Sequence, residues 1–467
     1  MRAFDVSLIA TSMAAMLIAS AGEARGQTFL AANNYPTPDE PVHLTTGDFT
    51  GDGRLDVAMA CNFAGQFAIF PQTAGGLLMF GGARNIVGSG HPVHVNAMQV
   101  NFLGAIDLVI ADGTGPLQAY ESDGTGNPSL WSLNASLDGQ PVGQAAMFST
   151  GFSIDGFANA VIGSGMTAVG GIQARVGDGD GTYEGFQQGP TLELGTGAGP
   201  MARGKLDSGP LDDDLAVCVS GSNIVKIMLF DGFVMCSDIC WRGYSFTNEC
   251  PIDVGEVAPP DVVVAANPIG VVLDHFDPAA NAHTDMAVLC AGDNSVRILR
   301  GNGNGTFTAT QTLTLGSAVK SIASGDLTGD NRADLAVCID PVGTGVGSVV
   351  ILVNNGAGTF SFGPNLTIPD RVRSITIADL SGDGRRDIAV VTVASVPPVV
   401  DDNLAVFRNS TTGCIANFDL MGGVGVPDIF AFLSAWFSQL PAADVDQNGV
   451  IAVPDIFGFL ARWFGGC

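Results

Sequence analysis

The stretch Gly47–Ala60 reads GDFTGDGRLDVAMA, and related stretches recur through most of the chain. Close copies are GDLTGDNRADLAVC at Gly325–Cys338 and ADLSGDGRRDIAVV at Ala378–Val391. Weaker copies between them read VNFLGAIDLVIA, SIDGFANAVIG, GPLDDDLAVCV and ANAHTDMAVLC. Aligned on their last acidic or Asn position, the copies fall at Asp56, Asp107, Asn159, Asp214, Asp285, Asp334 and Asp387. The spacings of 51, 52, 55, 71, 49 and 53 residues indicate a repeat architecture.

Each period contains short runs such as DLAVCI, SVVILV and SVRILR, which are rich in β-branched residues. A Gly/Asn turn followed by an aromatic residue closes several of the periods, as in GNGNGTFTA, NNGAGTFSF and GDGDGTYEG. Helical periodicity is missing until after residue 425. The pattern predicts about four short strands per period, and hence a mainly β, seven-bladed β-propeller of four-stranded blades.

Two irregularities in the repeat predict an insertion in one blade and a final blade that is completed by the N-terminal part of the chain. The 71-residue spacing contains an insertion around Cys236–Cys250. The last unit stops at NLAVFRNSTTG, without the aromatic-led strand that follows the other turns, and the early stretch GQTFLAANNY resembles GTFTATQTLT of the sixth turn. We therefore expect Thr28–Asn33 to complete the final blade; a disordered N-terminal tail is the alternative.

The charge balance excludes several classes of protein. The chain of 467 residues carries 46 acidic and 19 basic side chains, for a net charge of −27. Binding to nucleic acid or to an anionic membrane surface requires clusters of Lys and Arg, which this composition does not supply. With 46% apolar residues the chain can bury a large core, and its 63 glycines are consistent with many tight turns.

The N-terminus reads as an export signal. Arg2 precedes an apolar stretch from Val6 to Ala21, and Ala19-Ser20-Ala21 has the small-residue pattern of a cleavage site. We expect residues 1–24 to be a bacterial-type signal peptide, with an N-terminal anchor as the alternative. No later segment is long and apolar enough to span a bilayer, so the mature chain is predicted to be secreted, extracellular or at the cell surface.

Nine cysteines in an exported chain can form disulfides. Cys236, Cys240 and Cys250 cluster in one segment, where CSDIC favours a disulfide over a zinc site because no His lies near. In contrast, three cysteines lie inside apolar runs and are predicted to be buried free thiols: Cys218, Cys290 and Cys338.

The spacing of oxygen-bearing residues inside the first copy suits a calcium ion. In DFTGDGRLD, oxygen-bearing side chains occupy positions 1, 3, 5 and 9 of the loop, and a backbone carbonyl occupies position 7. Three carboxylates with hydroxyl and carbonyl oxygens favour Ca²⁺ over zinc. The predicted ligands are Asp48, Thr50, Asp52, the Arg54 carbonyl and Asp56 in the first copy; Asp326, Thr328, Asp330, the Arg332 carbonyl and Asp334 in the sixth; and Asp379, Ser381, Asp383, the Arg385 carbonyl and Asp387 in the seventh.

Glycine at Gly53 permits the positive φ that such a loop needs, and Asn331 can replace it in the sixth copy. The alternative interpretation of the loop is an Asx-rich hairpin turn without a metal. Copies two and three lack the carboxylate set, and copies four and five carry Lys205 and His275 near the first ligand position. These four units are expected to bind no metal, or to bind it weakly.

The DxTGDGxxDLAV loop followed by GxGTF resembles the FG-GAP/VCBS repeat of integrin-like propellers over residues 27–412. The resemblance implies a seven-bladed propeller with calcium in its blade loops. It also implies a role as a binding or adhesion scaffold.

Residues 414–467 form a second module. VPDIFAFLSAWF at Val426–Phe437 and VPDIFGFLARWF at Val453–Phe464 are near copies, each with Pro in the first helical turn. The first helix is expected to bury the stripe Ile429, Phe432, Leu433 and Trp436. Before the second helix, DVDQNGVIAVPD has EF-hand spacing, with predicted calcium ligands Asp444, Asp446, Asn448, the Val450 carbonyl and Asp455.

This module resembles a type I dockerin, which implies calcium binding and attachment to a cohesin-like or cell-surface partner. The weaker first half offers Asn417, Asp419 and Asp428 at positions 1, 3 and 12, with Met421 at position 5. The alternative is a small self-packing domain, and the two interpretations are compatible. Calcium and a Cys414–Cys467 disulfide would stabilise a domain of this size.

Motifs for catalysis are missing: the chain has no GxSxG, HExxH, P-loop or GxGxxG. The sequence HPVH could place His91 and His94 near each other, and we expect that pair to be structural. The predicted function is a secreted, calcium-stabilised, non-catalytic scaffold that binds a glycan or a protein. The alternative is a glycoside hydrolase or polysaccharide lyase of a dockerin-bearing system, with its site in the central funnel.

Overall fold

The computed structural model shows a mainly β protein with two short helices near the C-terminus. It describes residues 28–73, 84–87, 91–98, 106–112, 118–122, 124, 129–133, 159–164, 171–176, 192–209, 214–234, 238–241, 244–245, 258–277, 283–341, 346–394, 402–410, 418, 426–438, 440, 443, 445 and 451–465. The predicted signal peptide and the Cys414–Cys467 disulfide lie outside these residues.

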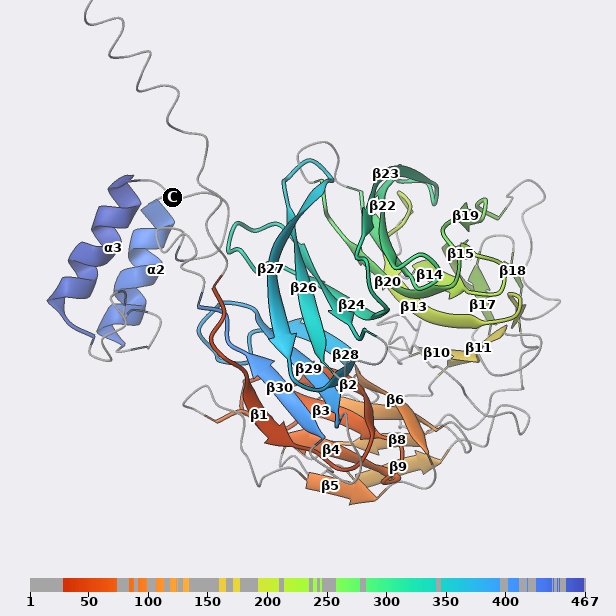
Figure 1. The fold of residues 1–467 in the computed structure, drawn as a ribbon, viewed down its shortest axis with the longest axis horizontal. Helices are drawn as coiled ribbons and strands as arrows, with labels where there is room; N and C mark the ends of the chain where they lie inside the picture. The colour runs from red at the N-terminus through yellow and green to blue at the C-terminus, as the bar shows by residue number, and fades with distance from the viewer. Residues whose placement is uncertain are drawn as a thin grey trace, which may run out of the picture.

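The strands form antiparallel sheets that follow one another along the chain (Figure 1). Two four-stranded sheets contain β2 (Pro41–Gly47), β3 (Asp56–Cys61), β4 (Gln66–Phe70) and β5 (Arg84–Val87), then β6 (Pro92–Met98), β7 (Asp107–Asp112), β8 (Gln118–Glu121) and β9 (Ser129–Leu133). A three-stranded sheet contains β10 (Asn159–Ser164), β11 (Gly171–Val176) and β12 (Leu192–Glu193). The next four-stranded sheet contains β13 (Ala198–Gly204), β14 (Asp214–Val219), β15 (Ile224–Met228) and β19 (Val262–Val263).

The second half of the chain is more regular. It contains β20 (Pro268–Asp274), β21 (Asp285–Cys290), β22 (Ser295–Gly301) and β23 (Phe307–Thr314), then β24 (Val319–Gly325), β25 (Asp334–Ile339), β26 (Gly347–Asn354) and β27 (Phe360–Ile368). The last sheet contains β28 (Arg371–Ala378), β29 (Asp387–Val393), β30 (Asn403–Phe407) and β1 (Asn33–Pro36).

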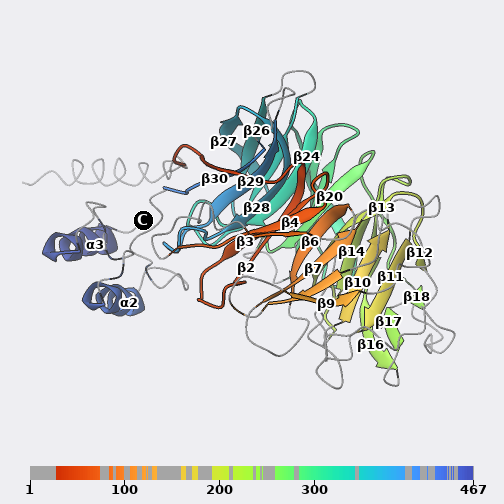
Figure 2. The same ribbon diagram turned by 90° about the horizontal axis from the view of Figure 1, so that it is seen from below.

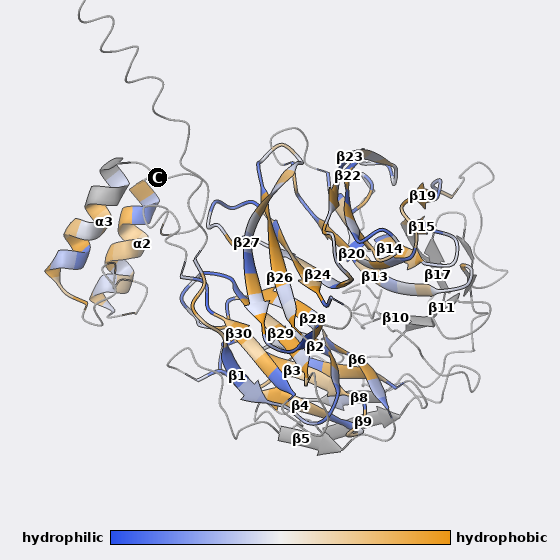
Figure 3. Cartoon of the chain, in the orientation of Figure 1, coloured by the Kyte–Doolittle hydropathy of each residue, from blue (hydrophilic) through white to orange (hydrophobic). Residues whose placement is uncertain are grey.

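The sheets are arranged as the blades of a β-propeller. The first strands of successive sheets contact one another from β13 to β20, β24 and β28, and β28 contacts β2, which contacts β6. Each aligned Asp or Asn of the repeat begins a strand. Six of these are the second strands of their sheets, namely β3, β7, β14, β21, β25 and β29, whereas β10 is the first described strand of its three-stranded sheet. Where their side chains are described in full, these second strands are buried almost throughout, which explains their apolar LAV-type sequences. Apolar residues run along β26 and β29 in the same way (Figure 3).

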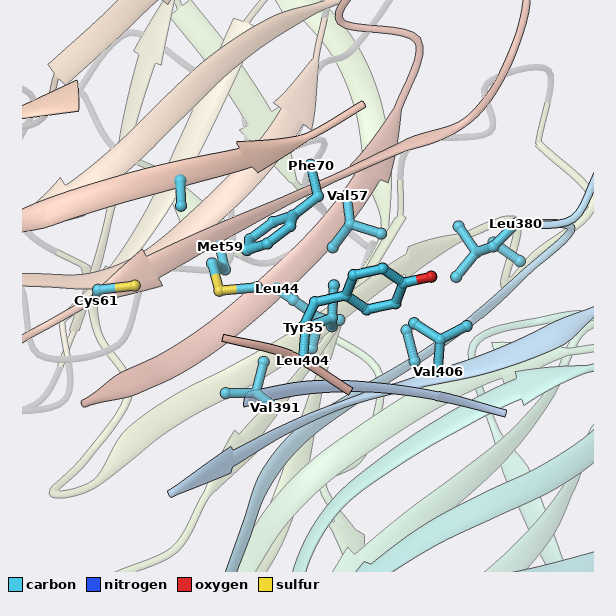
Figure 4. Close-up of a cluster of buried hydrophobic side chains, with 13 residues drawn as sticks. Tyr35, Leu44, Val57, Met59, Cys61, Phe70, Leu380, Val391, Leu404 and Val406 are labelled. Carbon is cyan, nitrogen blue, oxygen red and sulfur yellow. The ribbon is translucent and has the colours of Figure 1, made fainter. Parts of the chain in front are cut away.

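The chain closes the ring with a strand from its N-terminal part, as predicted. β1 pairs antiparallel with β30, and Phe29 forms a further bridge with Asn409. Tyr35 of β1 is buried against Leu404 and Val406 of β30 and against Leu44 of the first blade (Figure 4). The observed strand covers Asn33–Pro36, at the C-terminal edge of the predicted segment.

The insertion is also where the repeat spacing predicted it. β16 (Phe230–Val234), β17 (Asp238–Trp241) and β18 (Tyr244–Ser245) form a separate three-stranded sheet. The blade then resumes with β19, which pairs with β15. Among the described cysteines, the predicted buried free thiols Cys218, Cys290 and Cys338 are confirmed, and Cys61 is a fourth.

The helices α2 (Val426–Phe437) and α3 (Val453–Gly465) lie to one side of the sheets in both views (Figures 1 and 2). Their bounds agree with the prediction to within one residue. Phe432 and Phe459 stack with ring centroids 4.2 Å apart and an interplanar angle of 2°. The predicted stripe Ile429, Phe432, Leu433 and Trp436 belongs to the same apolar cluster. No helix in the described part of the chain is long and apolar enough to cross a membrane.

Candidate cation-binding loops

The three candidate loops each connect the first strand of a blade to the second. They lie between β2 and β3, between β24 and β25, and between β28 and β29. Residues at the predicted turn position adopt positive φ in all three: 80° at Gly53, 61° at Asn331 and 81° at Gly384. The sequence therefore predicted both the position of the loops and the replacement of Gly by Asn.

The first predicted ligand of each loop accepts backbone hydrogen bonds from the turn that follows it. Asp48 accepts from the N–H groups of Asp52 (3.0 Å) and Gly53 (2.8 Å). Asp326 and Asp379 make the same contacts, at 2.7–3.2 Å. This is the Asx-type geometry of the alternative interpretation, and the same hydrogen bonds hold the backbone of the turn in its curl.

The central predicted ligand pairs with the arginine two residues later. Arg54 forms an ion pair with Asp52, and Arg332 forms one with Asp330. In the third loop Arg385 Nη2 lies 2.6 Å from Asp383 Oδ2. The arginine backbone N–H also donates to the same carboxylate at 3.0 Å in all three loops.

The last predicted ligand lies behind the loop rather than on its surface. Asp56, Asp334 and Asp387 have no exposed area. Asp56 Oδ2 accepts from the N–H groups of Phe49 and Thr50, both at 3.0 Å, while its Oδ1 accepts from Gln72 N–H at 2.8 Å. Gln72 follows the third strand, so this one carboxylate joins the loop to the far side of its own blade.

The same buried aspartate occurs in blades that lack the cation set. Asp285 accepts from the N–H groups of Phe276 (2.9 Å), Asp277 (3.0 Å) and Gly301 (2.9 Å). Asp214 accepts from Leu206 N–H at 2.7 Å, and Asp107 from Ser122 N–H at 2.9 Å. Sequence reasoning assigned this position to metal binding alone and missed its structural role. That structural role could have been predicted, because the Asp recurs in copies that lack the other ligands.

Burial raises the pKa of these carboxyl groups. The pKa of Asp334 rises to about 7 and that of Asp387 to about 6, because desolvation outweighs the backbone hydrogen bonds they accept. The pKa values of Asp56 and Asp285 shift in the same direction for the same reason.

The donor set fits a hard cation in its chemistry. Thr50 Oγ1 and Ser381 Oγ, at the third position of two loops, are buried and make no hydrogen bond of normal geometry. Hydroxyl and carboxylate oxygens within one loop are the donors that Ca²⁺ prefers. The carboxylates are held by backbone N–H groups and arginines, and within the described residues no three His, Cys, Asp or Glu side chains are gathered around one point.

In the C-terminal module, the two predicted position-12 aspartates are buried. Asp455 accepts from Val445 N–H and Ala452 N–H, both at 2.8 Å, and therefore ties α3 to the loop before it. Asp428 occupies the equivalent position in the first turn of α2. The other predicted ligands of the module, Asn417, Asp419, Asp444, Asp446, Asn448 and Val450, lie outside the described residues.

The histidines pair differently from the HPVH prediction. His94 of β6 stacks on His43 of β2, with ring centroids 3.6 Å apart, whereas His91 Nδ1 lies 3.3 Å from the Asn62 carbonyl oxygen. The Nδ1 atoms of His43 and His94 are buried without hydrogen-bond partners. Burial lowers the pKa of His43 to about 4 and that of His94 well below its ordinary value. The pair is a packing contact between two blades.

The comparisons with known proteins agree with the repeat analysis. Residues 281–337 and 339–390 match the family described as FG-GAP-like repeat. The chain contains FG-GAP-like repeats. A search of curated proteins finds no match.

Similar solved structures indicate the fold. Two crystal structures of BBS1N in complex with ARL6DN, soaked with lead and with mercury, align with TM-scores of 0.53 and 0.52 at 14% identity. Each alignment covers 83% of this chain and 99% of the other. A functionally unknown protein from Desulfotomaculum acetoxidans DSM 771 aligns with a TM-score of 0.46 at 13% identity, covering 72% of this chain and 92% of that one. At 14% identity, the likeness to the two BBS1N complexes supports the fold alone.

Proposed function

We propose that this protein is a non-catalytic binding scaffold whose seven-bladed propeller presents a face to a glycan or a protein ligand. The observation that carries the proposal is the FG-GAP-like repeat folded as the blades of a β-propeller, whose last blade is completed by β1 and contacts the first. The seventh blade in this count is the β10–β12 sheet, whose β10 begins at the aligned Asn159 like the second strands of the other blades.

Calcium in the first, sixth and seventh blades is part of the proposal. Three loops repeat the same donor types at the same spacing, and in two of them the third-position hydroxyl, Thr50 or Ser381, is buried beside the carboxylate of the last predicted ligand. Bound calcium would neutralise charge that the loops concentrate. Asp52, Asp330 and Asp383 would exchange their arginine partner for the ion, which leaves the arginine side chains free to reach solvent.

The C-terminal helices are proposed to be a dockerin-like attachment module of an exported protein, with a cohesin-like or cell-surface partner. Phe430 and Phe457 support this part, because they are equivalent in the two near-identical helices and are 68% and 67% exposed. Large exposed apolar side chains of this kind mark interaction surfaces. We propose that calcium and the Cys414–Cys467 disulfide stabilise this small module.

The binding role is favoured over the alternative of a glycan-active enzyme. His43 and His94 lie where the first and second blades meet. Burial keeps both side chains neutral, and their imidazole rings stack on each other. An acid–base site instead needs groups that hold and release a proton near the working pH.

A glycan-array screen of the full mature chain, run beside glycosidase and polysaccharide-lyase assays on the same glycans, tests the function. We expect retention of a ligand without bond cleavage. Release of reducing ends, or of unsaturated products, from any glycan would overturn the scaffold proposal in favour of the enzyme.

A further inference from the structure

Each candidate loop receives a hydrogen bond from a side chain of the next blade. Asn409 Nδ2 donates to the Leu327 carbonyl of the sixth-copy loop at 2.8 Å. Ser122 Oγ donates to the Phe49 carbonyl of the first-copy loop at 2.7 Å. Gln72 Nε2 donates to the Leu380 carbonyl of the seventh-copy loop, across the closure of the ring.

The accepting carbonyl is equivalent in all three loops. Leu327 lies between the predicted ligands Asp326 and Thr328, and Phe49 and Leu380 lie between the corresponding residues of their loops. The donors Gln72, Ser122 and Asn409 are 2–3% exposed, so these hydrogen bonds are shielded from water. Fixing this carbonyl fixes the backbone from which two neighbouring ligand side chains project.

The donor residue is itself fixed by the buried aspartate of its own blade. Asn409 N–H donates to Asp387 Oδ1 at 2.8 Å, and Gln72 N–H donates to Asp56 Oδ1 at the same distance. The backbone N–H of each donor residue therefore holds it in its own blade, while its side chain donates to the loop of the neighbouring blade. In each case the donor residue therefore connects the buried aspartate of its own blade with the loop of the preceding blade.

We propose that Gln72, Ser122 and Asn409 are positioning residues for calcium in the loop of the preceding blade. This inference rests on the proposed calcium binding. A loop held in its binding conformation loses less freedom when the ion binds, so removing the inter-blade donor weakens the site although the donor touches no ligand oxygen. Calcium affinity in one blade is consequently set by a residue of the next.

The chain supplies a matched control for Asn409. Asn409 Nδ2 also donates to the Arg386 carbonyl at 3.0 Å. Asn354 makes the same two contacts, to the Phe276 carbonyl at 3.1 Å and to the Ala333 carbonyl at 3.0 Å. Phe276 belongs to the fifth copy, in which His275 stands at the first ligand position. Replacing Asn354 therefore removes the inter-blade contact from a loop without the cation set, together with the contact inside its own blade that Asn409 also makes.

The experiment compares Asn409→Ala and Asn354→Ala with the unchanged full chain, using calorimetric calcium titration and thermal unfolding in calcium or chelator. In chelator, both variants should lose a similar amount of thermal stability. Asn409→Ala should weaken calcium binding at one site by about 3- to 10-fold more than Asn354→Ala does, which is the value of one neutral hydrogen bond.

Ligand variants assign the affected site. In an Asp330→Asn background, which disables the sixth-copy loop, Asn409→Ala should cause no further loss of calcium binding. In an Asp383→Asn background, which disables the loop of its own blade, the loss should persist. The reverse pattern, or equal calcium affinities in Asn409→Ala and Asn354→Ala, would overturn the inference while leaving the calcium proposal intact. A full chain that binds no calcium at all would overturn both.

Discussion

The buried aspartate that begins each second strand serves a purpose broader than metal binding. In Asp285 both carboxylate oxygens accept backbone N–H groups, from the loop on one side and from the end of the third strand on the other. A buried N–H group without an acceptor costs about 1–3 kcal/mol. The repeat therefore requires an acidic residue here even in the blade whose loop has lost the cation set.

Replacing Asp285 with Ala is expected to lower the free energy of unfolding by about 3 kcal/mol or more, because three buried N–H groups lose their acceptor. Urea denaturation in the presence of chelator measures the loss. Asp261→Ala is the control, since Asp261 is partly exposed and forms an ion pair with the half-buried Lys226, and it should cost less than about 1 kcal/mol. Equal effects of the two variants would contradict the structural role of Asp285.

At the scale of the elements, blade contacts bring together strands that are far apart in the chain. β1 completes the sheet of β30 and adds Tyr35 to a core shared by the first and last blades. β2 and β6 meet through the stacked His43 and His94. The contact between the last and first blades therefore depends on β1 pairing with β30. The burial that keeps His43 and His94 neutral depends on β2 packing against β6.

Tyr35→Ala should lower the free energy of unfolding by about 3–5 kcal/mol, because it leaves a cavity where β1 packs on Leu404 and Val406. Tyr35→Phe keeps the ring and should cost much less. Chemical denaturation of both variants checks the expectation. A small effect of the Ala variant would mean that β1 contributes little to closing the ring.

Acid should destabilise the contact between β2 and β6. The pKa of His43 in the folded chain is about 4, against about 6.5 for an unperturbed histidine. Between these values the unfolded chain holds more protons, so the free energy of unfolding falls as the pH falls, by up to about 1.4 kcal/mol per pH unit for each such histidine.

The raised pKa values of Asp334 and Asp387 act in the opposite direction, because the folded chain then holds the extra protons as the pH falls. A double variant with His43→Phe and His94→Phe removes the histidine contribution alone. Urea denaturation from pH 7 to pH 4 should show a smaller acid loss in the variant than in the unchanged chain. Parallel curves would show that the histidines titrate normally.

At the scale of the whole molecule, the net charge of −27 is partly gathered in loops at one end of the first strands. Each candidate loop holds two carboxylates in its turn and a third behind it, and an arginine pairs with one of the carboxylates in the turn. A hard cation would offset this charge in three blades of one closed ring, so its effect on stability should extend over the whole propeller.

Chelation is therefore expected to lower the melting temperature of the full chain, and added calcium to restore it. A triple variant with Asp52→Asn, Asp330→Asn and Asp383→Asn should lose most of the propeller's calcium-dependent shift. Magnesium and sodium chloride at matched ionic strength separate specific binding from general screening. An unchanged melting temperature after chelation would show that the loops are Asx turns without a metal.

The sequence by itself determined the repeat period, the start of each second strand, the positive-φ turn residues, the closing segment near Thr28–Asn33 and both C-terminal helices. The turn residues and the helices depend on patterns within about ten residues, where turn chemistry and side-chain periodicity act. The repeat period and the closing segment came from comparing copies of one pattern along the chain. Only the tertiary structure decided that His43 meets His94 and that Gln72 reaches the carbonyl of Leu380, 308 residues away. Such contacts depend on which blades become neighbours in the folded chain. The link that the last aspartate makes between its loop and the end of the third strand depends instead on how each blade folds.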